Sequence, residues 1–269
     1  MKAIISTTYN NTYLYFLPII TWCWNKIGAD VICFIPNHSF DDKRVELIVK
    51  TASPILGGID LRLKTHYFDS PEHKEATYAQ VSRIYAAALD LPEDEILISG
   101  DVDMAVFGDY LKQKNADFDI FGYDLCPEKQ YSICYISATV KAWREAMQIN
   151  GRTYQQCLDD LLGGIEAEHF RGNYWGKDQE TAYNHISEYS NKYLHGRARP
   201  GTQFASRRYD RDDSFILDRL SPDTIDFHMN RPGYEPQNFE IILTILKYHY
   251  PYENLDWLIQ YTEAYKSLL

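Results

Sequence analysis

Two aspartates follow a short apolar run near the middle of the chain. The segment ILISGDVD, residues 96–103, contains Asp101 and Asp103 with a single valine between them. In extended backbone this spacing directs both carboxylates to one side of the chain, and paired carboxylates suit a hard cation such as Mg²⁺ or Mn²⁺. Because Asp-x-Asp also occurs in ordinary turns, the pair alone does not indicate a metal site, and the interpretation depends on the neighbouring elements. The apolar run predicts a strand directly before it, and ligands bind at the carboxyl ends of strands in open α/β sheets.

A histidine far downstream offers a third ligand. His228 ends a short apolar segment, residues 224–228, and Arg231 and Pro232 follow soon after. A single histidine near a strand end is more often an ordinary hydrogen-bonded side chain. An imidazole beside two carboxylates, however, is a common ligand set for Mn²⁺. Arg231 then suits a diphosphate, because a planar guanidinium pairs with two oxygens at once.

A third group of polar residues stands where a helix is predicted to begin. Asp178 and Gln179 come shortly after two aromatic residues, Tyr174 and Trp175. In one interpretation Asp178 is a plain N-cap. In the other, the acid and the amide face a reacting sugar, and the two rings form a stacking surface for the acceptor.

These three segments, in this order, resemble glycosyltransferase family 8, the nucleotide-sugar transferases of the glycogenin and lipopolysaccharide galactosyltransferase type, which have the GT-A fold. Residues 6–13 resemble the family's first strand and nucleotide-binding turn, and residues 78–84 resemble its helix with a donor-binding arginine. Residues 131–144 are similar to the strand and helix after the metal motif, and Asp178 with Gln179 matches the family's Asp-Gln pair. The likeness covers residues 1–235.

The resemblance implies a metal-dependent transferase that moves a sugar from a UDP- or GDP-type donor to a glycan or other hydroxyl acceptor, with retention of anomeric configuration. It also implies a role for each matching residue. Mn²⁺ or Mg²⁺ would be held by Asp101, Asp103 and His228. The donor would contact Thr7, Thr8, Tyr9, Asn11, Arg83, Asp101 and Arg231. The reacting sugar would face Asp178 and Gln179, and the acceptor would stack on Tyr174 and Trp175.

The chain departs from the family pattern at three places. Residues 132–134 read Ser-Ile-Cys where the family usually has an asparagine and a glycine, and Asn184 lies one residue late after Asp178. Arg231 replaces a lysine, follows His228 closely and lacks the intervening glycine. These departures indicate a divergent relative, and no sugar specificity is transferred to it.

Three other functions remain open at this point. A phosphatase with Asp101 as nucleophile is one, although such motifs usually lie on the first strand and continue into threonine or valine, whereas Met104 follows here. A sugar nucleotidylyltransferase also suits the fold, but residues 7–11 replace its glycine-rich, arginine-bearing loop. The third is a non-catalytic glycan-binding protein, for which the 22 tyrosines and 5 tryptophans would serve equally well.

Composition and charge narrow the class of protein. With 45% hydrophobic and 24% charged residues, the chain can bury a sizeable core, and its net charge of −11 argues against nucleic acid or anionic lipid as a partner. The 5 cysteines are an odd number without CxxC spacing, as in proteins with reduced thiols. Residues 13–24 are apolar but short for a bilayer, and Pro18 interrupts them. We therefore expect a cytoplasmic protein with no transmembrane segment.

The elements that position these residues follow from the apolar pattern and the capping signals. Strands are predicted at residues 3–6, 31–35, 95–99, 118–123 and 131–137. Helices are predicted after Asp42, from Ser70 to Leu89, over 140–150, from Asp178, over 238–248 and over 254–268. The helix after Asp42 should bury Val45, Ile48, Val49 and Ala52. The irregular stretch 195–213, rich in both arginine and aspartate, is either a self-neutralising solvated loop or a mobile basic lid over an anionic ligand.

Together these elements predict an α/β fold of the GT-A, Rossmann-like type. The sheet should be mixed and mostly parallel, with helices on both faces. We expect a transferase domain over residues 1–235, and a C-terminal helical extension over residues 236–269 that packs on the same domain.

Overall fold

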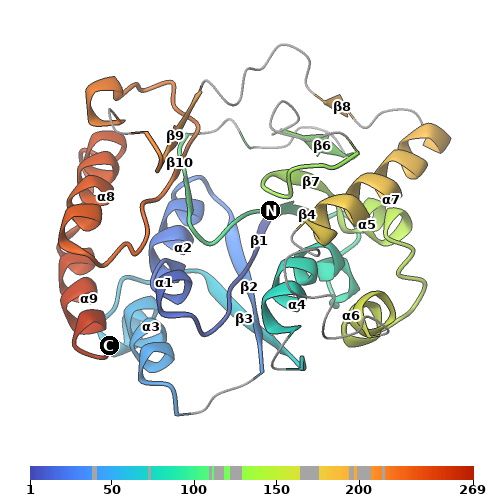
Figure 1. Ribbon diagram of the computed structural model, residues 1–269, viewed down its shortest axis with the longest axis horizontal. Coiled ribbons are helices and arrows are strands. Elements are labelled where there is room, and N and C mark those ends of the chain that lie inside the picture. The colour runs from blue at the N-terminus through green and yellow to red at the C-terminus, as the bar shows by residue number, and fades with distance from the viewer. Residues whose placement is uncertain are drawn as a thin grey trace.

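The computed structural model describes residues 1–37, 41–71, 74–108, 111, 118–121, 129–163, 176–193, 197–198, 207–213 and 216–269. Within these residues a seven-stranded sheet runs through the molecule, with helices on both faces (Figure 1). Its strands, in sheet order, are β3 (Leu63–Phe68), β2 (Asp30–Pro36), β1 (Lys2–Ser6), β4 (Ile96–Ser99), β7 (Ile136–Thr139), β6 (Asp119–Ile120) and β8 (Arg197–Ala198).

The first four strands of this order are parallel, β7 is antiparallel to both of its neighbours, and β8 is parallel to β6. A second, three-stranded sheet places β10 (Asp226–His228) between β5 (Met104–Val106), which is antiparallel to it, and β9 (Arg208–Asp210), which is parallel. The predicted α/β class, with a mixed and mostly parallel sheet flanked by helices, is confirmed.

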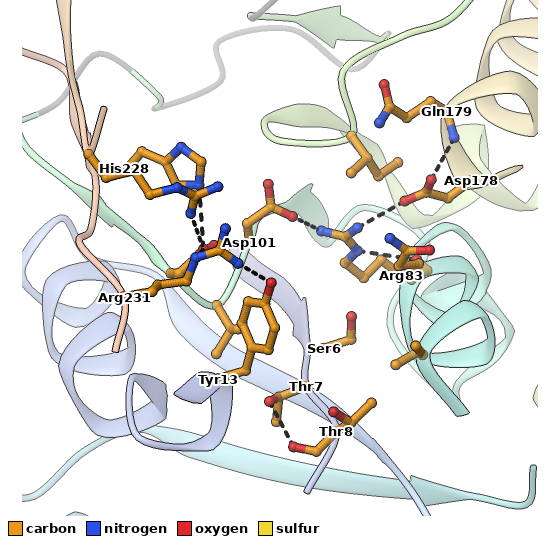
Figure 2. Close-up of a pocket in the computed structure, with 17 residues that line it drawn as sticks. Ser6, Thr7, Thr8, Tyr13, Arg83, Asp101, Asp178, Gln179, His228 and Arg231 are labelled. Carbon is orange, nitrogen blue, oxygen red and sulfur yellow. Dashed lines mark hydrogen bonds and ion pairs between the residues drawn. The ribbon is translucent and has the colours of Figure 1, made fainter. Parts of the chain in front are cut away.

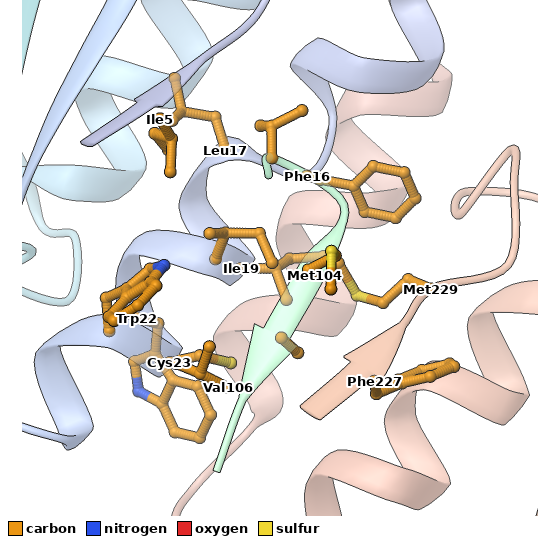
Figure 3. Packing of buried hydrophobic residues seen from close by; sticks show 14 of the residues in the cluster. Ile5, Phe16, Leu17, Ile19, Trp22, Cys23, Met104, Val106, Phe227 and Met229 are labelled. Atoms are coloured by element: carbon orange, nitrogen blue, oxygen red, sulfur yellow. The ribbon is translucent and has the colours of Figure 1, made fainter. Parts of the chain in front are cut away.

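Strand β1 shows how one sheet serves two cores. Ala3 and Ile5 are buried in one cluster, and Ile4 between them is buried in the other, because side chains alternate between the faces of a strand. Figure 3 shows part of the first cluster, which contains Ile5 and Leu17 together with Met104 and Met229. The small sheet is thereby packed on the same core as β1.

The helices on this side are α1 (Asn11–Leu14), α2 (Leu17–Lys26), α3 (Lys43–Ala52), α8 (Pro236–His249) and α9 (Asp256–Lys266). Helix α2 explains the apolar run at residues 13–24, because eight of its residues are buried and Pro18 stands in its first turn. None of the described helices combines the length and the apolar character that a membrane crossing needs.

The helices on the other side are α4 (Glu75–Ser82), α5 (Val140–Ala146), α6 (Tyr154–Leu162) and α7 (Lys177–Tyr193), and a 3₁₀ segment, Arg83–Ala88, continues α4. Thr139 caps α5, and Thr153 with Gln156 forms a capping box at α6. Two further 3₁₀ turns are Pro54–Leu56 and Ile216–Arg219.

Three sequence-based expectations need correction. The helix predicted from Ser70 begins at Glu75 in the described residues, and the backbone amide and carbonyl of Ser70 are hydrogen-bonded to the Asn37 side chain at 3.0 and 3.2 Å. The strand predicted at 131–137 begins only at Ile136, since Tyr135 has a φ of +68°, outside the range of a strand. Val49 is 49% exposed, so the buried face of α3 is narrower than predicted.

The two C-terminal helices pack into the core around α2. Tyr261 stacks on Tyr15 with ring centroids 5.5 Å apart and donates a hydrogen bond to the Tyr15 carbonyl at 3.0 Å. Tyr265 donates to the carbonyl of Asn11 at 2.8 Å. Helix α9 therefore holds the segment that follows β1, where the first polar residues of the candidate site lie.

Candidate active site

One cavity of about 340 Å³ collects most of the residues singled out by the sequence (Figure 2). It opens at the carboxyl ends of β1 and β4, and its size lies within the range of small-molecule pockets, about 300–1,000 Å³. Its polar lining residues are Ser6, Thr7, Thr8, Tyr13, Gln80, Arg83, Asp101, Asp103, Asp178, Gln179, Arg211, His228 and Arg231.

The aspartate pair directly follows a strand, as predicted, and a second strand that was not predicted comes after it. Strand β4 ends at Ser99 and β5 begins at Met104. Gly100 precedes Asp101 at a point where a Cβ would lie 3.1 Å from the Trp24 ring, so the backbone approaches the core closely here. Asp103 is 5% exposed, and the side chain of Asp101 is 32% exposed.

His228 reaches Asp103 because of strand pairing. The antiparallel register of β5 and β10 sets His228 opposite Met104, and the amide of Met229 donates to the Asp103 carbonyl at 2.9 Å. As a result, His228 Nε2 lies 3.4 Å from Asp103 Oδ2. Local sequence cannot produce this contact, so the third predicted ligand is brought to the pair by tertiary structure.

Asp103 is surrounded by cations. Arg211 Nη1 lies 3.0 Å from its Oδ2, and Arg231 Nε lies 3.6 Å away. Burial by itself raises the pKa of Asp103, but His228, Arg231 and Arg211 outweigh it, so that its pKa lies below the usual value. Asp103 is therefore a carboxylate held ready in its charged form.

The chemistry of these side chains fits a hard divalent cation. Neighbouring ligands of a six-coordinate ion lie about 3 Å apart when each bond is about 2.1 Å, close to the 3.4 Å between Asp103 Oδ2 and His228 Nε2. The Asp101 carboxylate lines the same cavity but is paired with Arg83. No cluster of three or more His, Cys, Asp or Glu side chains in the described residues is assembled as a metal site. For a cation to bind here, Asp101 must give up its ion pair with Arg83, and Asp103 must give up its ion pair with Arg211.

Asp210 lies behind the imidazole and was not singled out by the sequence. Parallel pairing of β9 with β10 sets Asp210 opposite His228, and its Oδ2 lies 3.5 Å from Nδ1. A carboxylate on the second nitrogen fixes the orientation of a metal-binding histidine. Arg211 comes next in the chain, and both residues belong to the stretch 195–213.

This stretch is only in part a solvated loop. Arg208 pairs with the buried Asp226 at 3.1 Å, and Arg211 lines the cavity. The loop interpretation is wrong for these two arginines, because alternating acidic and basic residues concealed a short strand, β9. Arg199 and the side chain of Arg197 lie outside what the structure describes, so the basic lid stays a prediction.

Arg83 joins the aspartate pair to helix α7. Its Nη2 donates to Asp178 Oδ2 at 2.9 Å, its Nη1 donates to the Gly100 carbonyl at 2.9 Å, and it also pairs with Asp101. Asp178 is 2% exposed, and its Oδ1 accepts a hydrogen bond from the backbone N–H of Gln179 at 2.9 Å. Burial raises the pKa of Asp178 more than Arg83 lowers it. Asp178 is the second residue of α7, two residues past the N-cap position at Gly176, so the plain N-cap interpretation is wrong.

The turn after β1 contributes Thr7 and Thr8 to the cavity. Tyr9 and Asn11 lie beside them in the chain but do not line the cavity; the Tyr9 carbonyl accepts from Arg44 at 2.9 Å, and Asn11 also bonds Arg44. The predicted acceptor residues, Tyr174 and Trp175, lie outside the described residues.

No protein-family model matches the chain. No curated protein matches it either. Among solved structures, the galactosyltransferase LgtC in complex with donor and acceptor sugar analogs is 10% identical with a TM-score of 0.45, over 99% of this chain and 96% of LgtC. The glycosyltransferase GlyE of Streptococcus pneumoniae TIGR4 is 12% identical with a TM-score of 0.39, over 99% of this chain and 64% of GlyE. Similarity at this level assigns no function.

The charges of the cavity are balanced. Three arginines, Arg83, Arg211 and Arg231, line it together with three aspartates, Asp101, Asp103 and Asp178. In a chain with a net charge of −11, placed arginines are the local device that admits an anion. A divalent cation bound to Asp101 and Asp103 would neutralise these carboxylates, and the arginines that now pair with them could then bind the anion.

Proposed function

We propose that the chain is a glycosyltransferase. It transfers a sugar from a UDP- or GDP-type donor to a glycan or other hydroxyl acceptor, with Mn²⁺ or Mg²⁺ held by Asp101, Asp103 and His228. The observation that carries the proposal is the 3.4 Å approach of His228 Nε2 to Asp103 Oδ2 in a cavity that also holds Arg83, Asp178 and Arg231. These are residues on which the sequence resembles a nucleotide-sugar transferase family.

The leaving group in such a reaction is a nucleoside diphosphate. When bound, the ion stabilises the charge that develops on it. Arg231 is proposed to add positive potential at the diphosphate. In support, its guanidinium contacts Asp103 and bonds the Tyr13 hydroxyl, with its carbon 5.1 Å from the centre of the Tyr13 ring. Thr8 and Tyr9 are proposed to contact the ribose and base, with Thr7 and Asn11 as further donor contacts; Thr7 and Thr8 line the cavity.

The surroundings of Asp178 support retention. An inverting enzyme needs a carboxylate that takes a proton from the acceptor hydroxyl. Both carboxylate oxygens of Asp178 accept hydrogen bonds, one from the Arg83 guanidinium and one from the backbone N–H of Gln179, and the Asp178 side chain is buried. Gln179 lines the cavity with an amide, which is no base, so this pair is suited to orient the sugar.

Three further parts of the proposal concern the acceptor, the cellular location and the domain organisation. Tyr174 and Trp175 are proposed to stack against the acceptor because they stand just before Asp178 in the sequence. A cytoplasmic location is proposed from the free, buried thiols of Cys23, Cys33, Cys134 and Cys157. Residues 1–235 and the C-terminal helices are proposed to form one folding unit, since α8 and α9 contribute to the same core as β1.

The test is turnover of a panel of UDP- and GDP-sugars with Mn²⁺, with and without simple sugar acceptors, read as released nucleoside diphosphate. Asp103→Asn should lower release by about 10²-fold or more, whereas Asp218→Asn, which makes the same charge change at an exposed site, should preserve it. A glycan-binding protein would bind sugars and release no nucleotide. A phosphatase would release inorganic phosphate from sugar phosphates, and that result would replace the proposal.

A further inference from the structure

Three nitrogen atoms crowd one carboxylate oxygen in the cavity. Asp103 Oδ2 lies 3.0 Å from Arg211 Nη1, 3.4 Å from His228 Nε2 and 3.6 Å from Arg231 Nε. A carboxylate oxygen has two lone pairs, so these groups compete for it. Arg211 makes the shortest of the three contacts.

The Asp103 side chain is 7% exposed, and a buried carboxylate without a partner is strongly destabilising. Arg231 divides its guanidinium between Asp103 and the Tyr13 hydroxyl, and His228 divides its ring between Asp103 and Asp210. Arg211 therefore makes the closest of the three charged contacts of Asp103 in the structure described here. A metal ion on Oδ2 would meet this guanidinium at the same oxygen, and the two positive charges repel each other.

We propose that Arg211 is a placeholder for the metal. It neutralises Asp103 while the ion is absent, and it turns to the diphosphate of the donor once the ion has taken over the carboxylate. The inference rests on the proposed function, in which Asp103 and His228 bind the ion. It adds a donor-binding residue that the family resemblance does not supply.

The backbone around Arg211 permits this exchange. The turn after β9 is held by hydrogen bonds from the amides of Asp212 and Asp213 to Asp210, at 3.2 and 2.9 Å. Asn230 Nδ2 donates to the Arg211 carbonyl at 3.2 Å. The turn can thus stay fixed on β10 while the Arg211 side chain, 22% exposed, rotates about its own bonds.

The two functions of Arg211 make opposite predictions for two ligands. Removing the guanidinium removes a competitor of the metal, so Mn²⁺ should bind tighter. The same change removes a phosphate contact, so nucleoside diphosphate should bind more weakly. A residue with a purely structural function would weaken both or change neither.

The experiment is calorimetric titration of Mn²⁺, and of UDP and GDP in saturating Mn²⁺, into wild type, Arg211→Gln and Arg211→Lys. For Arg211→Gln we expect Mn²⁺ to bind about fivefold to tenfold tighter and the better of the two nucleotides to bind about tenfold more weakly. Arg211→Lys keeps the charge without the planar fork, so both effects should have the same signs and be smaller. If Arg211→Gln does not fold, Arg211→Lys decides by these signs.

Arg62→Gln is the matched control, because it makes the same charge change at a 49% exposed guanidinium paired with Asp30. It should leave both affinities at the wild-type values. Mn²⁺ affinity that is unchanged or weaker in the Arg211 variants, or that rises equally in Arg62→Gln, overturns the inference and leaves the proposed function standing. Nucleotide affinity that is unchanged in the Arg211 variants also overturns it. Absence of Mn²⁺ binding in wild type and in every variant overturns both the proposed metal site and the inference.

Discussion

Arg83 Nη2 donates to Asp178 Oδ2 across 2.9 Å, and both side chains are almost wholly shielded from water. The two residues are 95 positions apart in the chain. Since Arg83 also donates to the Gly100 carbonyl, this one side chain sets helix α7 at a fixed distance from the end of β4. The residues proposed to face the sugar and those proposed to bind the metal are positioned by the same guanidinium.

Replacing Arg83 with methionine leaves Asp178 buried without its cation. Breaking one side of a buried ion pair costs about 3–5 kcal/mol, so we expect a loss of this order in the free energy of unfolding, measured in urea. The double variant Arg83→Met with Asp178→Leu should recover most of the stability, because no unpaired charge is left buried. It should remain inactive, because both polar side chains of the candidate site are missing. A loss below about 1 kcal/mol in the single variant would show that Asp178 is not held in charged form by Arg83.

Turnover should depend on Mg²⁺ or Mn²⁺ and on both aspartates. Because the leaving diphosphate needs its charge offset in the transition state, Asp101→Ala and Asp103→Ala should each lower kcat/KM by about 10²–10³. The measurement is nucleoside diphosphate release under saturating metal, compared with release after addition of excess chelator. Full activity in chelator would show that the aspartates are structural.

Much of this fold follows from local patterns. Strands β1, β2 and β4 are continuous apolar runs, and α7 begins beside the Asp178 that predicted it. Helix α8 covers the predicted residues 238–248, with a proline in its first turn. In each case the signal lies inside the element itself, because apolar periodicity and capping act over a few residues.

The parts that could not be predicted depend on distant partners. Ser70 carries a helix-start pattern, but its backbone is hydrogen-bonded to the side chain of Asn37, which follows the neighbouring strand β2. Arg211 and Asp210 looked like members of a self-neutralising loop, and only the pairing of β9 with β10 brings them to His228 and Asp103. The aspartate pair was visible because its two members are neighbours in sequence, whereas their cationic partners are not.

The hydroxyl of Tyr265 should matter for donor binding more than for stability. It donates to the Asn11 carbonyl at 2.8 Å and so holds the turn after β1. Tyr265→Phe should lower stability by about 1 kcal/mol and raise the donor KM several-fold, with little effect on kcat. Tyr261→Phe is the control, since it loses a similar bond to the Tyr15 carbonyl and should leave KM unchanged. Equal KM changes in both variants would contradict a specific function of Tyr265.

His249 should make the protein sensitive to acid. It stacks on Phe107 with centroids 3.8 Å apart, and burial lowers its pKa from 6.5 to about 4. Below pH 6.5 His249 stays neutral in the folded state but gains a proton in the unfolded state. The contribution of His249 to the free energy of unfolding is therefore fully present above pH 6.5 and is lost as the pH falls toward 4. Between pH 7 and pH 5, wild type should lose about 1–2 kcal/mol more than His249→Phe, which keeps the stacking. Urea unfolding of both proteins at the two pH values measures this, and equal losses would contradict it.

The claim on which the account depends most is that Asp101, Asp103 and His228 hold one cation at the diphosphate of the donor. The direct measurement is diffraction from crystals grown with Mn²⁺ and UDP or GDP, with the ion located by its anomalous signal. We predict one peak about 2.0–2.3 Å from Asp103 Oδ2, His228 Nε2 and an Asp101 oxygen, in contact with the diphosphate and with Arg211 withdrawn from Asp103. A diphosphate bound in the cavity with no ion at these three side chains, or an ion bound elsewhere, would contradict the account.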